Sequence, residues 1–277
     1  MLDLCLAILT GSANGILFRL SEGRVRNRFS MLAFNYLLCL VLALFYSSSS
    51  LQGSVLTSPL TVVFGVINGC LFLTGFVMMQ KCTHDHGVVL TSIFSRLGVL
   101  VPTLLAITVF REKISLIQLT GILLAVFAII MMNWQKGTGL KNMAPALIVL
   151  LLCAGCCDSM AKIYDQWGNP SLSQQYLLIS FAVALILNVV LVVMKKEKID
   201  RMDILFGLLI GIPNYYVARF LLKAVNLIPA VIVYPSFSVG TILVCTLAGV
   251  VLFHEKIGKK QALGIGVILL SLVLLNI

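Results

Sequence analysis

The chain has 277 residues, of which 60% are hydrophobic and 11% are charged. Because soluble domains carry about 25% charged residues, this composition excludes an ordinary soluble protein and indicates an integral membrane protein. A net charge of +10 would suggest nucleic acid as the partner of a soluble protein. Here the cations lie mostly between apolar runs, so no nucleic acid is expected.

Ten apolar runs follow one another, and each is expected to be a transmembrane helix because a lone spanning segment must satisfy its own backbone hydrogen bonds. The runs cover residues 2–20, 31–46, 60–80, 88–109, 115–133, 143–164, 172–194, 203–223, 228–252 and 258–277. At roughly 20 residues per crossing, they leave room for short loops but not for a soluble catalytic or nucleotide-binding domain. The first run lacks the basic segment and cleavage site of a signal peptide, so it is expected to be the first span.

One sequence pattern occurs twice. From Phe110 the chain reads FREKISLIQLTGILLAVFAIIMMN, and from Phe253 it reads FHEKIGKKQALGIGVILLSLVLLN. The second copy ends the chain, so the first is expected to end an internal half, which gives two halves, residues 1–137 and 138–277. Because five spans per half is an odd number, the second half must enter the membrane from the opposite side. The expected fold is therefore an all-α integral membrane protein of ten transmembrane helices, arranged as two inverted five-helix repeats.

The repeated Phe-x-Glu-Lys-Ile pattern, followed by a Gln, a Gly and an apolar helix at the end of each half, resembles the EamA-type branch of the drug/metabolite transporter superfamily. The resemblance implies a multi-pass transporter of the inner or plasma membrane, with the lipid bilayer and a small-molecule substrate as partners. It also implies that the first, third, fourth, sixth, eighth and ninth spans line a central cavity. A homodimer is left open as an assembly.

The orientation of the chain follows from the cations in the turns. The turns after the odd-numbered spans hold most of the lysines and arginines. By the positive-inside rule this bias places both termini outside the cytoplasm. Members of the resembled superfamily usually have both termini inside, so the charge bias opposes the family norm.

Asp158 lies in the middle of the sixth run, and its repeat equivalent is Asn14 in the first run. An ionisable group deep in a span indicates a functional site, and burial in hydrocarbon disfavours the charged carboxylate. Asp158 is therefore the candidate for proton coupling, or for binding a cationic group. The first span of each half is also similar to the first helix of the small multidrug resistance family, in which an acidic residue near this depth binds drug and proton in competition. The alternative is a structural Asp paired with a neighbouring helix.

Arg96 lies about halfway along the fourth run. Placing an arginine centrally costs about 2.5–3.5 kcal/mol, so this side chain is expected to face protein or water. On a continuous helix, Ser92, Arg96 and Thr103 would share one face, with Pro102 bending the helix nearby. Arg96 could bind a carboxylate or phosphate through a bidentate contact, and the alternative is an internal salt bridge with Asp158.

Further polar residues in the spans are candidates to line the substrate site. Asn214 and Tyr215 lie beside Pro213 in the eighth run, and Tyr234 precedes Pro235 in the ninth run, so both prolines are expected to disrupt their helices. Asn68 and Asn35 lie in the third and second runs, where hydrogen bonds between helices are the alternative. The predicted substrate-binding residues are Asn14, Asn68, Ser92, Arg96, Asp158, Asn214, Tyr215 and Tyr234.

Other chemistry-bearing residues are expected to be structural. Glu112 lies at a helix start and is expected to complement the dipole there, while Gly121, Gly264 and Gly266 are expected to allow close helix packing. The segment His84-Asp85-His86 is expected to be a solvated turn. No P-loop, catalytic triad or convincing metal-ligand spacing is present, and nearly all cysteines lie inside apolar runs. Neither a metal nor a cofactor is therefore expected.

The leading hypothesis is a secondary transporter, not an enzyme, that moves a small polar or amphipathic metabolite such as an amino acid by alternating access through a central cavity. Arg96 and Asp158 together favour a zwitterion or an acid. Export or exchange is expected by analogy with the family. The first alternative is efflux of multiple drugs or cationic compounds by proton antiport. A membrane-embedded enzyme, a non-transporting subunit or sensor, and a channel are the alternatives from other classes.

Overall fold

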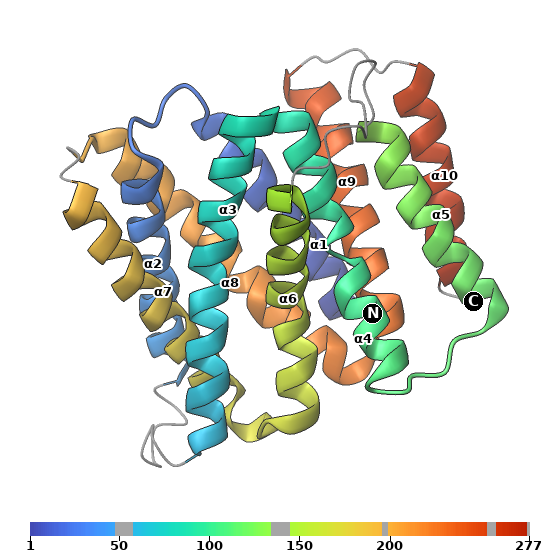
Figure 1. Ribbon diagram of the computed structural model, residues 1–277, viewed down its shortest axis with the longest axis horizontal. Coiled ribbons are helices and arrows are strands. Elements are labelled where there is room, and N and C mark those ends of the chain that lie inside the picture. Colours follow the sequence, from blue (N-terminus) through green and yellow to red (C-terminus); the bar gives the residue numbers. More distant parts are fainter. Residues whose placement is uncertain (48–57, 134–144, 196–198, 254–258, 276–277) are drawn as a thin grey trace. The chain divides into compact units, whose positions relative to one another are not determined.

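The computed structural model describes residues 1–47, 58–133, 145–195, 199–253 and 259–275, and the regular elements in these ranges are helices (Figure 1). The helices are α1 (Leu2–Ser21), α2 (Arg28–Ser47), α3 (Pro59–Leu97), α4 (Leu100–Thr108), α5 (Leu116–Asn133), α6 (Pro145–Trp167), the short η2 (Pro170–Leu172), α7 (Ser173–Lys195), α8 (Arg201–Leu227), α9 (Ala230–Phe253) and α10 (Lys259–Leu275). The prediction of an all-helical chain is confirmed.

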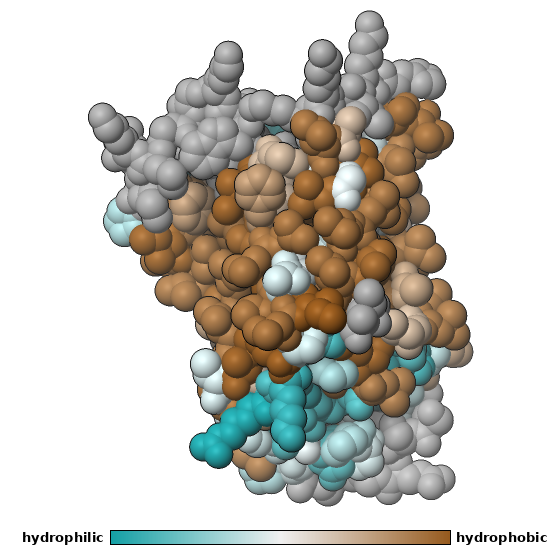
Figure 2. Space-filling view, turned by 90° about the vertical axis from the view of Figure 1, so that its right-hand side faces the viewer, coloured by the Kyte–Doolittle hydropathy of each residue, from teal (hydrophilic) through white to brown (hydrophobic). Residues whose placement is uncertain are grey.

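Many of these helices suit a membrane. By length and composition, seven helical segments among the described residues can cross one, and shorter apolar helices cover Phe94–Thr108, Leu116–Met131 and Ala262–Leu275. Large apolar side chains such as Leu2, Phe45 and Leu116 are more than 70% exposed. Hydrophobic residues also cover most of the face shown in Figure 2. Such a surface fits contact with lipid, and the chain is a multi-pass membrane protein.

The third and fourth predicted runs differ from the structure. The predicted turn at His84-Asp85-His86 is wrong, because α3 continues as a helix from Pro59 to Leu97. Its 39 residues correspond to about 58 Å at 1.5 Å per residue, which is longer than one membrane crossing. The break falls instead at Gly98 and Val99, because the ring of Pro102 clashes with the carbonyl of the residue four positions earlier.

The prolines in α8 and α9 also differ from expectation. Pro213 lies inside α8 and Pro235 lies inside α9, and both helices continue through them. The predicted disruption is therefore wrong. Prolines are tolerated in transmembrane helices because neighbouring groups satisfy the backbone that they leave unpaired. The thiol of Cys39 donates to the carbonyl of Gly211 at 3.3 Å, a contact that joins α2 to α8 two residues before Pro213.

The described chain divides into two compact units, and each unit joins segments from both predicted halves. Unit 1 contains Met1, Thr74–Lys162 and Ala224–Ile277, and unit 2 contains Leu2–Leu73 and Ile163–Lys223.

In unit 2, α2 packs against α7. The side-chain amide of Asn188, near the end of α7, donates to the carbonyl of Phe29, near the start of α2, at 3.1 Å, so the two helices run antiparallel. Glycines allow close packing of α3 on α7 and of α8 on α2. A Cβ at Gly69 would lie 2.6 Å from the carbonyl oxygen of Ser180, and one at Gly211 would lie 2.9 Å from that of Asn35.

In unit 1, α5 packs against α10, and α4 packs against α9. The hydroxyl of Ser271, late in α10, donates to the carbonyl of Gly121, early in α5, at 2.9 Å, so α5 and α10 are antiparallel. A Cβ at Gly121 would lie 3.0 Å from the side chain of Leu275, as expected for a close-packing glycine. For Gly266 the expectation is wrong, because nothing lies within 4 Å of the Cβ position.

A buried carboxylate anchors the start of α8. The side chain of Asp203 accepts hydrogen bonds from the backbone N–H groups of Arg26 at 2.9 Å, Asn27 at 3.2 Å and Asp200 at 3.1 Å. Replacing Asp203 with alanine is expected to lower the free energy of unfolding by about 2–4 kcal/mol, because three donors lose a charged acceptor. The thermal unfolding midpoint of the purified protein measures this effect. The control is Asp200→Ala, which removes an exposed carboxylate, and equal midpoints for the two variants would contradict the prediction.

Candidate functional site

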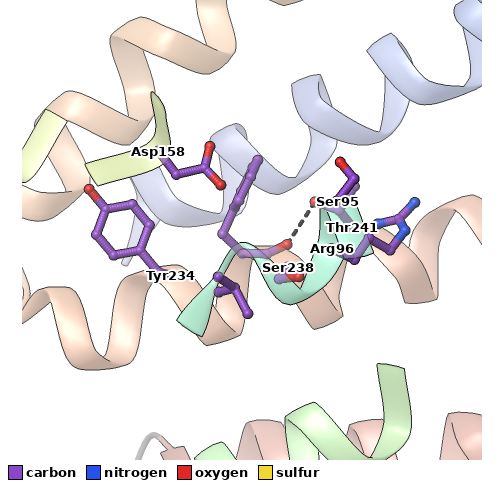
Figure 3. Close-up of a pocket in the computed structure, with 8 residues that line it drawn as sticks. Ser95, Arg96, Asp158, Tyr234, Ser238 and Thr241 are labelled. Carbon is purple, nitrogen blue, oxygen red and sulfur yellow. Dashed lines mark hydrogen bonds between the residues drawn. The ribbon is translucent and has the colours of Figure 1, made fainter. Parts of the chain in front are cut away.

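Unit 1 contains a cavity of about 130 Å³, shown in Figure 3. It lies where the end of α3 meets α6 and α9. Its lining consists of Ser95, Arg96, Val99, Asp158, Tyr234, Phe237, Ser238 and Thr241. Three of the predicted site residues, Arg96, Asp158 and Tyr234, therefore come together around one cavity.

Two glycines set the spacing between α3 and α6 beside this cavity. A Cβ at Gly155 would lie 2.5 Å from the carbonyl oxygen of Gly98 and 2.5 Å from the side chain of Val101, so only glycine fits there. Arg96 lies two residues before Gly98, and Asp158 lies three residues after Gly155. The close contact of α3 with α6 at Gly98 and Gly155 is called the glycine crossing below. It places the side chains of Arg96 and Asp158 at the same cavity.

Helix α9 contributes half of the described lining residues, and it does so from a single face. Tyr234, Phe237, Ser238 and Thr241 follow the spacing i, i+3, i+4 and i+7, which brings side chains to one side of a helix. The hydroxyl of Thr241 donates to the carbonyl of Phe237 at 2.7 Å, along the helix. Tyr234 is almost fully buried, so its ring forms a wall of the cavity.

The two charged side chains of the lining do not pair with each other. In Figure 3, Asp158 and Tyr234 lie together, whereas Arg96 lies apart from them with its guanidinium directed away from Asp158. Within the described residues, no ion pair joins Arg96 to an acidic side chain. The cavity therefore has a guanidinium in one part and a carboxyl group in another.

Asn14, Asn68, Asn214 and Tyr215 do not belong to this lining. In unit 2, the amide of Asn68 donates to the hydroxyl of Ser180 at 3.1 Å, and the amide of Asn214 donates to Oδ1 of Asn35 at 3.2 Å. The hydroxyl of Tyr215 donates to Oε1 of Gln174 at 3.1 Å. For Asn68 and Asn35 these contacts are the hydrogen bonds between helices that the alternative interpretation describes.

Asn14, Ser92 and Thr103 require separate comment. Asn14 lies half-buried in α1, in unit 2. Ser92 lies in α3, but its side chain is outside the described residues. The expectation that Ser92, Arg96 and Thr103 share a face assumes one continuous helix and is wrong, because the break at Gly98 puts Thr103 on α4. The hydroxyl of Thr103 donates to the carbonyl of Val99 at 2.8 Å.

The structure adds residues that the sequence did not single out. Ser95, Ser238 and Thr241 place hydroxyl groups around the cavity. Ser238 and Thr241 could have been predicted, because their spacing from Tyr234 places all three on one face of a helix. Ser95 could not have been predicted in this way, because the place where α3 ends decides which of its faces meets the cavity.

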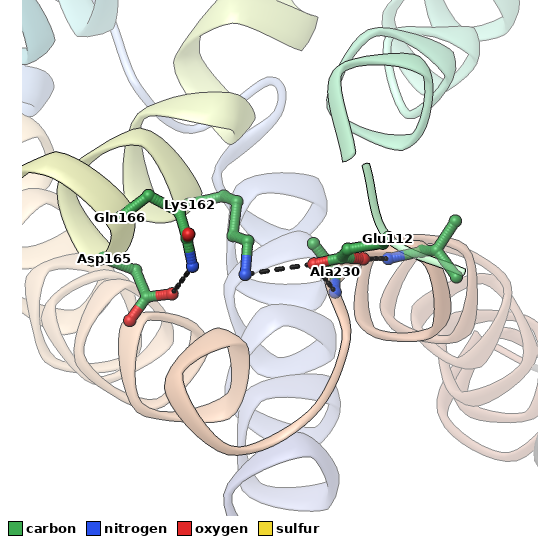
Figure 4. A network of polar contacts seen from close by, with 6 residues as sticks. Glu112, Lys162, Asp165, Gln166 and Ala230 are labelled. Carbon is green, nitrogen blue, oxygen red and sulfur yellow. Dashed lines mark hydrogen bonds and ion pairs between the residues drawn. The ribbon is translucent and has the colours of Figure 1, made fainter. Parts of the chain in front are cut away.

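Glu112 caps a helix, but not the one expected. Its carboxylate accepts hydrogen bonds from the backbone N–H groups of Ala230 at 3.1 Å and Val231 at 2.9 Å, at the start of α9 (Figure 4). The expectation that Glu112 complements the start of the helix following it in sequence is therefore corrected. It also forms an ion pair of 3.0 Å with Lys162 of α6.

The comparisons with known proteins agree with a transporter. Residues 145–277 match the EamA-like transporter family. Over 280 aligned residues, the chain is 24% identical to an uncharacterised protein of Haemophilus influenzae, covering 96% of this chain and 94% of that protein. A chain of known crystal structure has the same fold, with a TM-score of 0.77 at 14% identity, covering 99% of this chain and 94% of that one.

Fold and comparisons define a class: an all-helical, multi-pass membrane protein whose residues 145–277 match a family of transporters. Within that class, the family match confirms the resemblance to the EamA-type branch of the drug/metabolite transporter superfamily. The matched family is a family of transporters rather than enzymes.

Proposed function

We propose that the chain is a secondary transporter that moves a small zwitterionic metabolite, such as an amino acid, across the membrane by alternating access. The cavity of unit 1 carries this proposal, because it holds a guanidinium and a carboxylate that are not paired with each other. A buried unpaired charge is costly. A zwitterion supplies the missing partner for both groups at once, whereas an ion pair between them would leave little for a ligand to satisfy.

Each lining residue has a role in this proposal. Arg96 binds the substrate carboxylate through its planar fork of donors. Asp158 binds the ammonium group and carries the coupling proton when the site is empty. The hydroxyl groups of Ser95, Ser238 and Thr241 hydrogen-bond to further polar atoms of the substrate, and Phe237 and Tyr234 contact its apolar part.

Alternating access requires two inverted halves, and the helix pairs support this arrangement. The pairs α2–α7, α4–α9 and α5–α10 each join helices at the same position in the two five-helix halves, 1–137 and 138–277. The first and last of these pairs are antiparallel, as judged from Asn188 with Phe29 and from Ser271 with Gly121. Inverted repeats related by a pseudo-two-fold axis in the membrane plane bring equivalent helices together in this antiparallel way.

Further features of the transporter belong to the same proposal. The membrane is the inner or plasma membrane, and transport proceeds as export or exchange, in line with the family. The bias of cations toward the turns after odd-numbered spans favours both termini outside the cytoplasm.

Efflux of cationic compounds by proton antiport is the second candidate. The carboxylate of Asp158 beside the ring of Tyr234 favours it, because a carboxylate and an aromatic face together bind organic cations. Arg96 distinguishes the two candidates. The guanidinium of Arg96 would bind the carboxylate of a zwitterion, whereas it would repel a cationic compound.

A thermal-shift screen of metabolites on the purified protein tests the proposal. Amino acids and related zwitterions are expected to raise the unfolding midpoint. In Arg96→Ala the affinity for the same compound is expected to fall about 10–100-fold, as for a charged hydrogen bond worth about 1.5–3 kcal/mol. Arg201→Ala removes an exposed arginine and serves as the matched control. Stabilisation by organic cations alone, strengthened in Arg96→Ala, would favour the antiport candidate instead.

A further inference from the structure

The ion pair between Glu112 and Lys162 occupies a position from which it can close the cavity. We propose that this pair, together with the start of α9, is a gate that seals the Asp158 end of the cavity and opens by separation of the two side chains. The proposal rests on the alternating-access function above, and it adds the residues that perform one of its closures. In the following, this contact is called the Glu112–Lys162 gate.

Three elements meet at the gate. Glu112 comes from the connection between α4 and α5, Lys162 from α6, and the two N–H donors from the first residues of α9 (Figure 4). The side chains of Lys162 and Glu112 are only 8% and 13% exposed, and their Nζ and Oε1 atoms are 3.0 Å apart. The Lys162 ammonium also lies 5.9 Å from the centre of the Phe110 ring. A single carboxylate thus connects three segments of unit 1.

The gate lies one helical turn from the cavity on two helices. Lys162 follows Asp158 by four residues on α6, and Ala230 precedes Tyr234 by four residues on α9. Residues four apart occupy the same face of a helix, about 6 Å apart along its axis. The faces of α6 and α9 that line the cavity therefore continue directly into the gate, which lies just beyond the Asp158 and Tyr234 end.

The energetics of the contact suit a reversible closure. A largely buried ion pair pays a desolvation penalty that offsets much of its attraction, so separating both partners into water costs little. Removing only one partner is costly, because the other charge stays buried and unpaired. In the gate, the positive end of the α9 dipole adds to the attraction for Glu112. Such a contact has two states of similar free energy, one paired and dry, the other separated and hydrated.

The backbone beside Glu112 supports a conformational role. Arg111, the residue before it, has a φ of +53°, in the left-handed region that is unfavourable for a residue other than glycine. The adjacent N–H of Glu112 donates to the carbonyl of Ala106 at 3.0 Å, which fixes the end of α4 in this conformation. Strain of this kind persists where the surrounding structure enforces it, and it is typical of clamps and switch regions. Release of Glu112 from α9 would allow the strained backbone to relax.

The sequence contains the residue types of the gate twice. At the offset of 143 residues Glu112 corresponds to Glu255, and at the offset of 144 residues that relates Asp158 to Asn14, Lys162 corresponds to Phe18, the residue before Arg19. A cation on the first helix and a glutamate before the last helix of a half thus occur in both halves. A transporter of inverted halves needs one closure at each face of the membrane, and the repetition in sequence is consistent with this need.

Sided labelling of a cysteine in the cavity tests the gate. The probe is a membrane-impermeant cationic methanethiosulfonate reagent, applied to Ser238→Cys in right-side-out and in inverted vesicles, with peptide mass spectrometry reading the modification of that cysteine. Adding Lys162→Met is expected to raise the labelling rate about tenfold from one face of the membrane and to leave the rate from the other face unaltered. A tenfold change corresponds to a coupling of about 1–3 kcal/mol between the ion pair and the closed conformation. Lys162→Arg keeps the ion pair and is expected to label at the unaltered rate.

A second variant separates gating from electrostatics and from misfolding. Glu112→Gln removes a negative charge, whereas Lys162→Met removes a positive one. If these charges only attracted or repelled the cationic reagent, the labelling rate of Ser238→Cys would fall in the first variant and rise in the second. If the gate opens, the labelling rate rises in both variants. Glutamine also keeps an acceptor oxygen for the N–H groups of α9, so this variant retains the cap. Lys223→Met, at an exposed position, controls for the loss of a lysine.

The outcomes distinguish the gate from the function on which it rests. If folded Glu112→Gln and Lys162→Met label Ser238→Cys at the unaltered rate from both faces of the membrane, the gate proposal is contradicted, even when wild-type protein exchanges substrate. A rise from both faces supports the gate as a closure but contradicts alternating access. A rise from one face in a protein that exchanges no metabolite supports the gate and contradicts the proposed function.

Discussion

Replacing Gly155 with valine is expected to destabilise the protein strongly. The Cβ would lie 2.5 Å from both the carbonyl oxygen of Gly98 and the side chain of Val101, and backbone cannot move aside as a flexible side chain can. Overpacking in a well-packed interior costs about 1–3 kcal/mol, and a branched side chain at this crossing should reach the upper part of that range or exceed it. The thermal unfolding midpoint and the binding of a stabilising metabolite would both fall, because α3 and α6 would move apart beside Arg96 and Asp158.

A glycine in open space provides the control for this prediction. Nothing lies within 4 Å of the Cβ position at Gly75, which is in helix α3. Gly75→Ala is expected to keep or raise the unfolding midpoint, because alanine favours a helix by up to about 1 kcal/mol over glycine. If Gly155→Val and Gly75→Ala unfold at the same temperature, the glycine crossing does not hold the site together.

Replacing Asp158 with asparagine is expected to uncouple transport from protons. Asparagine has nearly the same shape and keeps a hydrogen-bonding carbonyl oxygen, but it cannot release or take up a proton. Accumulation of substrate driven by a proton gradient in proteoliposomes should fall by about tenfold or more. Exchange without a gradient should fall less, because asparagine keeps a hydrogen-bond acceptor for the substrate ammonium group. The repeat equivalent Asn14 already has an amide at this position, so only one half would carry the coupling group.

Asp165 on the same helix is the matched control for this change. Its carboxylate lies two turns beyond Asp158 and accepts a hydrogen bond from the amide of Gln166 at 3.0 Å. Asp165→Asn should leave the response to a proton gradient unaltered. Equal gradient-driven accumulation by Asp158→Asn and wild-type protein would contradict the coupling role of Asp158.

The sequence predicted the helical fold because long apolar runs in a membrane allow few alternatives. It failed where a boundary depends on local backbone detail. The polar segment Lys81–His86 suggested a turn, but it contains no proline, and α3 continues through it. Pro102 acts four residues upstream, at Gly98, and this displacement changed which side chains share a face with Arg96.

The site was predictable in part for the same reason. Arg96 and Asp158 stand out because charges in apolar spans are rare, and Tyr234 because it precedes a proline in a span. The structure brings these three together. The contact of Glu112 with Lys162 and α9 could not be predicted, because the three segments are distant in sequence and the repeat does not say which residues within one half meet.

Counterflow in proteoliposomes tests most directly whether the cavity of unit 1 holds the transported metabolite. Vesicles loaded with an unlabelled zwitterion that stabilises the protein are expected to accumulate the labelled compound. Arg96→Ala is expected to slow this exchange about tenfold or more, whereas Arg201→Ala, which removes an exposed arginine, is expected to exchange at the wild-type rate. Equal exchange by Arg96→Ala and wild-type protein would contradict the assignment of this cavity as the substrate site.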